Sequence, residues 1–287
     1  MESRQALRCY ITIAFFLLST AAAAAVPDSE LKTAYVGKVL TLRQFDSAPQ
    51  LRFDAAGKLI GKSSPEAWTV AGQLRVQDIS LQQGVLHVRG QRLFLFYDSH
   101  TKSLREVGSV NNGDTARRRF LHKLPQWYAK ASKVEIQIEC GELQTQDDAS
   151  KAMNSVFLPP DALLTDVVPA AWRSWLNRTS GESAQNLGNS TGLYRAGDGV
   201  SPPKLKYPQD PTYPEIARQA RYQATTVLML VVEANGSPRD IQIVRPAGMG
   251  LDERAVWAVQ QWKFDPAKKD GQPVPVQMSV EVNFGLF

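Results

Sequence analysis

The apolar pattern of residues 209–287 constrains the fold more than any other feature of this 287-residue chain. Two apolar runs meet at Asn235-Gly236, a dipeptide typical of a tight β-hairpin. Apolar residues then recur at helical spacing from Leu251 to Trp262. From Val274 to Phe284 apolar and polar residues alternate strictly, which is typical of a strand with one dry and one wet face. This order predicts an α+β domain in which a three-stranded antiparallel sheet packs on a helix.

The connections predict the strand order 2-1-3, with the last strand beside the first. Pro273 and Pro275 precede or open that last strand, and proline is tolerated at strand starts and sheet edges. We therefore expect the last strand to lie at an exposed edge. Trp262 and Phe264 should fix the end of the helix to the sheet, and Pro266 should end it.

The preceding residues predict a separate, mostly-β domain. Residues 26–142 contain short apolar runs divided by Gly, Asp and Gln turns, ending in the alternating segment KVEIQIEC. Residues 143–208 predict a short helical segment followed by a flexible linker rich in Ser, Gly, Asn and Pro. The predicted TonB-like domain described below then occupies residues 209–287.

Residues 1–25 predict a secretory signal peptide or an N-terminal membrane anchor. Arg4 and Arg8 precede an uncharged stretch that ends in small residues at Ala21–Ala25. This arrangement is typical of a cleaved bacterial signal, although the uncharged stretch is also just long enough to span a bilayer. Both alternatives predict export to the periplasm, the second with the chain anchored in the inner membrane.

Charge and motif content argue against several classes of function. The formal net charge is +5 and the basic residues are spread along the chain, so we expect no nucleic-acid partner. No metal-ligand, nucleophile-elbow or phosphate-loop motif occurs, and we expect no enzyme, cofactor or metal site. Outside residues 1–25 the sole cysteine is Cys140, which predicts a small buried strand residue without a disulfide.

Several spaced motifs resemble the C-terminal domain of the TonB family: a helix opened by YP at Tyr213-Pro214, the Asn235-Gly236 hairpin, WKFDPA from Trp262, and the closing GQPVPV strand. The resemblance implies a periplasmic domain that contacts TonB-dependent outer-membrane transporters. It further implies that a receptor peptide, the TonB box, adds to the sheet beside the last strand. The residues implied in peptide binding are Val274, Val276, Gln277, Met278, Ser279, Val280, Glu281, Val282, Tyr213 and Pro214. The residues implied in the structural motif are Asn235, Gly236, Trp262, Phe264 and Pro266.

Two functions remain open from the sequence. The chain is either an energy transducer coupled to ExbB/ExbD-type inner-membrane proteins, or a periplasmic adaptor that uses the same domain without a motor. An exposed edge strand would also allow a homodimer. In either case we expect Val280→Pro to abolish peptide binding by removing a donor from the last strand.

Overall fold

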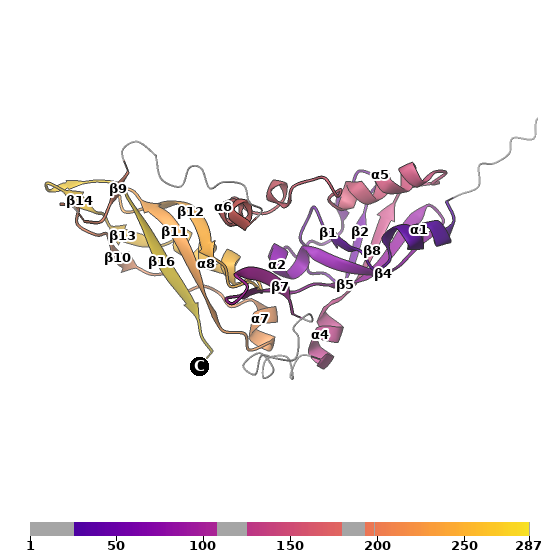
Figure 1. Ribbon diagram of the computed structural model, residues 1–287, viewed down its shortest axis with the longest axis horizontal. Coiled ribbons are helices and arrows are strands. Elements are labelled where there is room, and N and C mark those ends of the chain that lie inside the picture. The colour runs from indigo at the N-terminus through magenta and orange to yellow at the C-terminus, as the bar shows by residue number, and fades with distance from the viewer. Residues whose placement is uncertain (1–25, 108–124, 180–192, 198, 287) are drawn as a thin grey trace, which may run out of the picture.

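The computed structural model describes residues 26–107, 125–179, 193–197 and 199–286, arranged as two lobes side by side (Figure 1). The predicted signal or anchor at residues 1–25 lies outside the described residues. None of the helices in the described ranges is both long enough and apolar enough to cross a membrane.

The first lobe is built on a six-stranded sheet with two helices packed on it. The sheet order is β1-β4-β5-β8-β2-β3, and all neighbours are antiparallel except β2 and β8. Leu31 of one helix and Met153 of the other are buried in the same core as Ile136 of the sheet. The elements are β1 (Val39–Thr41), β2 (Gln50–Phe53), β3 (Leu59–Ile60), β4 (Gln73–Gln82), β5 (Val85–Arg92) and β8 (Lys133–Glu139), with helices α1 (Asp28–Tyr35) and α5 (Gln146–Val156).

Period-two alternation explains why these strands form. In β8 the side chains of Val134, Ile136 and Ile138 are buried while their neighbours are partly or fully exposed. Helix α5 begins with a capping box, in which the Thr145 side chain accepts from the Asp148 N–H and the Asp148 carboxylate accepts from the Thr145 N–H. This box satisfies main-chain N–H groups at the start of α5.

The second lobe is a four-stranded sheet in the order β12-β11-β16-β9, packed on α8. The hairpin β11–β12 and the antiparallel pair β11–β16 place the last long strand beside the first. A short strand, β9, then pairs in parallel with the start of β16. The elements are β9 (Tyr194–Arg195), α7 (Glu215–Gln219), β11 (Ala224–Val232), β12 (Pro238–Arg245), α8 (Leu251–Gln260) and β16 (Val276–Phe284), with two small ladders formed by β10 (Lys204–Tyr207) with β13 (Lys263–Asp265) and β14 (Lys268–Lys269) with β15 (Gln272–Pro273).

The segment between the lobes is more structured in its described part than the composition suggests. Besides α5 it contains the 3-10 turn η1 (Leu164–Asp166) and helix α6 (Ala170–Thr179). Trp172 and Trp175 of α6 are buried in the core of the second lobe, and the helix lies along β12. Two tryptophans that bury large apolar areas hold this helix in place. Residues 180–192 of the predicted linker lie outside the described residues.

The two lobes share one hydrophobic core, although the sequence predicts a separate mostly-β domain. Helix α2 (Trp68–Ala71) and the hairpin β6 (Leu95–Asp98) with β7 (Ser103–Glu106) come from the first half of the chain. Trp68, Phe94 and Phe96 from this region are buried in the same cluster as Leu228 and Ile243 of the second lobe. The remaining helix, α4 (Pro125–Ala131), leads into β8. The mostly-β half is therefore packed against the second lobe.

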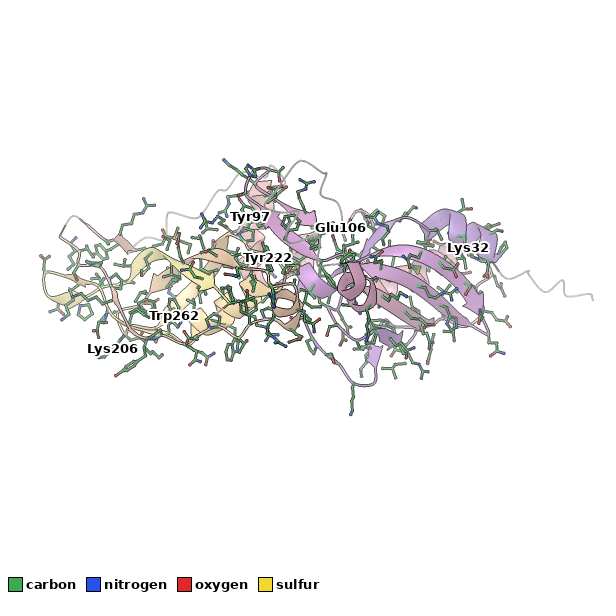
Figure 2. The ribbon with its side chains drawn as sticks, turned by 90° about the horizontal axis from the view of Figure 1, so that it is seen from below. Lys32, Tyr97, Glu106, Lys206, Tyr222 and Trp262 are labelled. Atoms are coloured by element: carbon green, nitrogen blue, oxygen red, sulfur yellow. The ribbon has the colours of Figure 1, made fainter. Side chains whose placement is uncertain are left out.

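Main-chain hydrogen bonds join the lobes at residues 247–249. The N–H of Tyr97 donates to the Ala247 carbonyl at 2.9 Å, and the N–H of Met249 donates to the Leu95 carbonyl at 2.7 Å. The Tyr222 hydroxyl also donates to Ala247, and Figure 2 shows Tyr97 and Tyr222 near each other at this junction. Gly248 lies between them with φ +84°, and a Cβ there would lie 2.4 Å from the Leu95 carbonyl oxygen. Only glycine allows so close a main-chain approach.

Candidate peptide-binding edge

The outer edge of β16 is open from Met278 to Phe284 in the described part of the chain. On its inner side β16 pairs with β11 along its whole length, in a register that includes Leu228 with Val280. On its outer side the ladder is limited to β9, which pairs with Val276 and Gln277. A row of main-chain groups is thus left available for an added strand.

The direction of each main-chain group follows from one hydrogen bond. The N–H of Tyr194 in β9 donates to the Pro275 carbonyl at 3.1 Å, so Pro275 faces the outer edge. N–H and C=O directions alternate along a strand. Ser279, Glu281 and Asn283 therefore present their N–H and C=O groups outward. The even-numbered residues present theirs to β11.

This alternation corrects the expectation for Val280→Pro. The N–H of Val280 belongs to the internal ladder with β11, because Val280 is an even-numbered residue opposite Leu228. Proline there would break the sheet itself instead of the open edge. The alternation of side chains in the sequence indicates which face of β16 is dry. It does not indicate which main-chain N–H groups point to the outer edge, because that follows only from the pairing of β9 with β16.

The start of the predicted binding strand is already covered. Val276 is buried in a small cluster with Val200 and Ala267, and Val274 packs against that cluster. The Val274 N–H donates to Ala267 at 2.9 Å, and Gln277 pairs with β9. Val274, Val276 and Gln277 are therefore occupied within the chain. The sequence did not predict that these residues are covered, because β9, which pairs with the start of β16, is only two residues long.

The remaining strand residues have one apolar and one polar face. Met278 and Val280 are half-buried against the shared core, whereas Val282 is buried. Ser279 and Glu281 are exposed on the opposite face. Glu281 lies 3.6 Å from Arg245 of β12, an exposed ion pair that contributes little stability. An added strand could cover the outer flanks of Met278 and Val280 with its own apolar side chains.

Tyr213 lies beside the far end of β16, whereas the Pro214 ring lies against Gly250 at the junction of the lobes. The Tyr213 ring makes an edge-to-face contact with Phe284 at a centroid distance of 5.6 Å, and its hydroxyl donates to the Tyr222 carbonyl. Burial raises the pKa of the Tyr213 hydroxyl, so it remains a neutral donor at physiological pH. Pro214 is buried and precedes α7, where its missing N–H is not needed. The structure thus brings Tyr213 beside β16.

The hairpin turn at Asn235-Gly236 packs against the strand that follows α8. The Asn235 side chain accepts from Ser237, and Gly236 has φ +79°. A Cβ on Gly236 would lie 2.0 Å from the Phe264 carbonyl oxygen, and the Phe264 N–H donates to the Gly236 carbonyl at 3.0 Å. Glycine is required here by both φ and space.

The WKFDPA segment holds the end of α8, but the expectation that Pro266 ends the helix is wrong: α8 ends at Gln260, and β13 lies between it and the proline. The Trp262 indole N–H donates to the Gln209 carbonyl at 2.9 Å, and the Trp262 and Phe264 rings lie 6.1 Å apart. Both side chains are buried, and Pro266 follows after one further residue. These contacts connect α8 to the chain entering the second lobe.

Asp252 and Glu253 form a buried acidic pair that no motif in the sequence indicated. The Asp252 carboxylate accepts from the N–H groups of Ala247 and Gly248, each at 2.7 Å, and from the Thr226 hydroxyl at 2.8 Å. Burial raises its pKa to about 6, although these donors oppose the shift. Asp252 thus fixes the loop on which the first lobe packs. The sequence indicates this role of Asp252 only by placing an acidic residue in the first turn of α8, after a loop that contains two glycines.

Glu253 is partly exposed as a residue, but its carboxyl group is buried beside α6. One oxygen accepts from the Trp172 indole N–H at 2.8 Å, and the other has no hydrogen-bond partner among the described atoms. Burial, with the nearby Asp252 charge adding to it, raises the pKa of Glu253 to about 8. This shift favours the protonated form of the Glu253 carboxyl at neutral pH.

The second lobe matches a known family in sequence. Residues 209–286 match the model of the Gram-negative bacterial TonB protein C-terminal domain. Residues 209–286 of this chain belong to the TonB family. This confirms, for these residues, the resemblance suggested by the YP, Asn-Gly and WKFDPA motifs. We call this region the TonB domain.

Curated relatives match this chain over a short segment. The match to protein tonB2 of Pseudomonas aeruginosa is 38% identical over 77 residues and covers 26% of this chain and 28% of the relative. Protein TonB of Vibrio cholerae is 34% identical over 77 residues, covering 26% and 32%, and protein TonB of Xanthomonas campestris is 32% identical over 77 residues, covering 26% and 34%. The matched segment thus spans about a third of these relatives.

A solved structure is also similar. The solution NMR structure of the Pseudomonas aeruginosa TonB CTD is 19% identical and covers 31% of this chain and 89% of that chain, with a TM-score of 0.26. The family assignment therefore depends on the sequence matches.

Proposed function

We propose that this chain is a TonB-like energy-transducing protein of the periplasm, and that its TonB domain binds the TonB box of outer-membrane TonB-dependent transporters by strand addition to β16. The open outer edge of β16 from Met278 to Phe284 carries this proposal. Main-chain bonds to an open edge supply general affinity, and pockets for alternate side chains supply selectivity. The family match supports the choice of partner.

The added strand would pair with the outward groups of Ser279, Glu281 and Asn283. Its apolar side chains would lie beside Met278 and Val280, both of which are half-buried at the edge. Tyr213, packed on Phe284, would bound the site at the end of β16. The β9 segment bounds it at the start, so the accessible site is shorter than the sequence predicted.

The test is binding of a synthetic TonB-box peptide to the full chain, followed by fluorescence anisotropy. Glu281→Pro removes an outward donor and should weaken binding at least about tenfold, as expected for losing main-chain bonds in an added strand. Glu281→Ala removes the exposed side chain but keeps the donor, and should bind within about twofold of the original chain.

Circular dichroism and the thermal midpoint serve as fold controls for both variants. A folded Glu281→Pro protein that binds the peptide as tightly as the original chain would exclude the edge of β16 as the site. Ser279→Pro provides a second, independent removal of an outward donor. Val280→Pro should instead lower the thermal midpoint, since its N–H belongs to the internal ladder.

Energy coupling would require residues 1–25 to remain as an inner-membrane anchor that meets ExbB/ExbD-type proteins. Val26, the first described residue, is 5% exposed and its N–H donates to the Leu143 carbonyl, so it is already part of the first lobe. Intact mass of the membrane and soluble fractions decides the matter. A membrane-bound chain that retains residues 1–25 supports transduction, whereas a soluble chain starting at Val26 excludes direct coupling to a motor.

A further inference from the structure

We propose a second peptide-binding site in the first lobe: a groove along the free edge of β1 that takes an extended segment of a partner protein bearing apolar residues and one acidic side chain. This site lies outside the TonB domain and is independent of the function proposed for β16.

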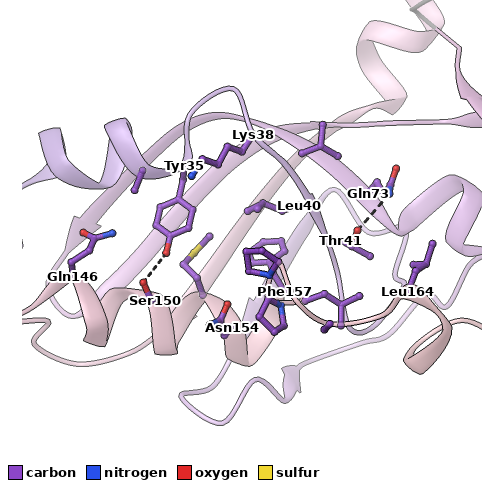
Figure 3. Close-up of a pocket in the computed structure, with 17 residues that line it drawn as sticks. Tyr35, Lys38, Leu40, Thr41, Gln73, Gln146, Ser150, Asn154, Phe157 and Leu164 are labelled. Carbon is purple, nitrogen blue, oxygen red and sulfur yellow. Dashed lines mark hydrogen bonds between the residues drawn. The ribbon is translucent and has the colours of Figure 1, made fainter. Parts of the chain in front are cut away.

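The groove is a cavity of about 780 Å³ between β1, the end of α1 and helix α5 (Figure 3). That volume lies within the range of ligand sites in proteins. Its floor is apolar, with Leu40, Met153 and Phe157, and its rim includes Pro159 and Pro160. Polar groups converge on the two sides: the Tyr35 hydroxyl donates to Ser150 at 3.4 Å, and the Gln73 amide donates to Thr41 at 3.5 Å.

On the groove side of β1 the main chain of Val39 is available, since the other outward residue, Thr41, already accepts from Leu158. Strand β1 is the edge of its sheet, and its inner bonds run to β4 through Lys38 and Leu42, since the Val76 N–H donates to Lys38 and the Leu42 N–H donates to Gly72. By alternation, Val39 and Thr41 face outward. Val39 is 42% exposed and lines the groove.

Residues 156–158 of the chain already pair with the neighbouring part of this edge. The Leu158 N–H donates to the Thr41 carbonyl at 2.8 Å, and the Arg43 N–H donates to Val156 at 2.9 Å. Pro159 then follows, and the chain departs before reaching Val39. An extended segment that continues this pairing would bond the N–H and C=O of Val39. This geometry favours a peptide over a compact small molecule.

The charge of the groove selects an acidic segment. Lys38 is the charged residue among those that line it, and no Asp or Glu is in the lining. The Lys38 ammonium lies 5.9 Å from the centre of the Tyr35 ring, and none of the ion pairs found among the described residues includes it. A carboxylate on the bound segment would give this cation a partner. The short free edge limits the contact to a few residues.

The experiment uses a phage-displayed library of random eight-residue segments, held between fixed linkers so that no free terminus is presented, selected against the full chain. We expect enriched segments to alternate apolar residues and to contain an acidic residue. A selected segment should bind Lys38→Glu at least about tenfold more weakly. Selection against Lys38→Glu should yield basic residues at the corresponding position.

Matched variants separate this groove from other surfaces. Lys58→Glu makes the same charge change at an exposed lysine elsewhere in the lobe and should leave binding within about twofold. Ser150→Trp fills the cavity without altering β1 and should abolish binding. Glu281→Pro, which alters the β16 edge, should have no effect, so failure of either site is recognised separately.

The proposal is overturned if no segment is enriched above the level obtained with Ser150→Trp. It is equally overturned if the enriched segments bind Lys38→Glu and Lys58→Glu alike, or lose binding in Glu281→Pro. Thermal midpoints within a few degrees of the original chain establish that the variants are folded.

Discussion

Two buried carboxyl groups at the junction of the lobes, those of Glu253 and Asp252, make the stability of the fold depend on pH. The Glu253 carboxyl is buried with one unpaired oxygen, and its pKa is raised to about 8 by burial. Burial likewise raises the pKa of the neighbouring Asp252 to about 6. For both acids the folded protein holds the proton more tightly than the unfolded chain. Stability therefore falls as pH rises from about 4.5 through the folded-state pKa of Glu253.

Glu253→Gln should remove most of this pH dependence. Glutamine keeps an oxygen that can accept from Trp172 but has no proton to lose. We expect the variant to match the original chain near pH 5 and to exceed it by about 3 kcal/mol of unfolding free energy near pH 8. Urea unfolding at the two pH values measures this. Equal pH dependence in both proteins would mean that Glu253 is ionised in the fold.

Among the secondary-structure elements, the two glycine turns of the TonB domain differ in what surrounds them. Gly236 has φ +79° and its Cβ position is occupied by the Phe264 carbonyl, whereas Gly271 has φ +81° and nothing within 4 Å of the Cβ position. Both turns require a left-handed backbone. Only the first also requires the absence of a side chain.

Gly271→Ala should therefore cost about 1 kcal/mol of unfolding free energy, which is the cost of a left-handed alanine. Gly236→Ala should cost at least about 2 kcal/mol more, because the hairpin must move away from Phe264. Thermal or urea unfolding of the two variants measures the difference. Similar losses in both would mean that the hairpin adjusts freely around Phe264.

The elements of the TonB domain could largely be predicted, because each is signalled by its own residues. Asn235-Gly236 marks the hairpin, and the alternation from Val274 to Phe284 marks β16 and its dry face. Strand β9 could not be predicted, since two residues carry no periodicity and its pairing depends on packing with Val200 and Ala267. This is why the start of the predicted site was placed on residues that are already covered.

At the scale of the whole molecule, the lobes are held together by contacts between residues about 150 positions apart in the sequence. The bonds from Tyr97 and Met249 are main-chain bonds, so side-chain patterns do not reveal them. The sequence is equally consistent with burial of Trp68, Phe94 and Trp172 in cores formed by residues near them in the chain. Their burial in the second lobe's core follows only from the tertiary arrangement.

Truncation should therefore destabilise the TonB domain. A fragment of residues 193–287 loses Phe94, Phe96 and Trp172 from its core, and a fragment of residues 164–287 retains α6 and loses only the first lobe. We expect thermal midpoints in the order full chain, 164–287, 193–287, since each step exposes more apolar surface. Calorimetry measures them. A TonB-domain transition unchanged by removal of the first lobe would mean that the shared core contributes no coupling.

The close contact at Gly248 restricts which residues related proteins can carry at this position. Its φ of +84° alone would admit asparagine, but the Leu95 carbonyl, 2.4 Å from its Cβ position, would not. TonB domains that descend from ancestors without the first lobe should thus tolerate asparagine or aspartate at the corresponding position. Lineages that carry the lobe should retain glycine there, and a gain of the lobe should be accompanied by the loss of every larger residue from that site.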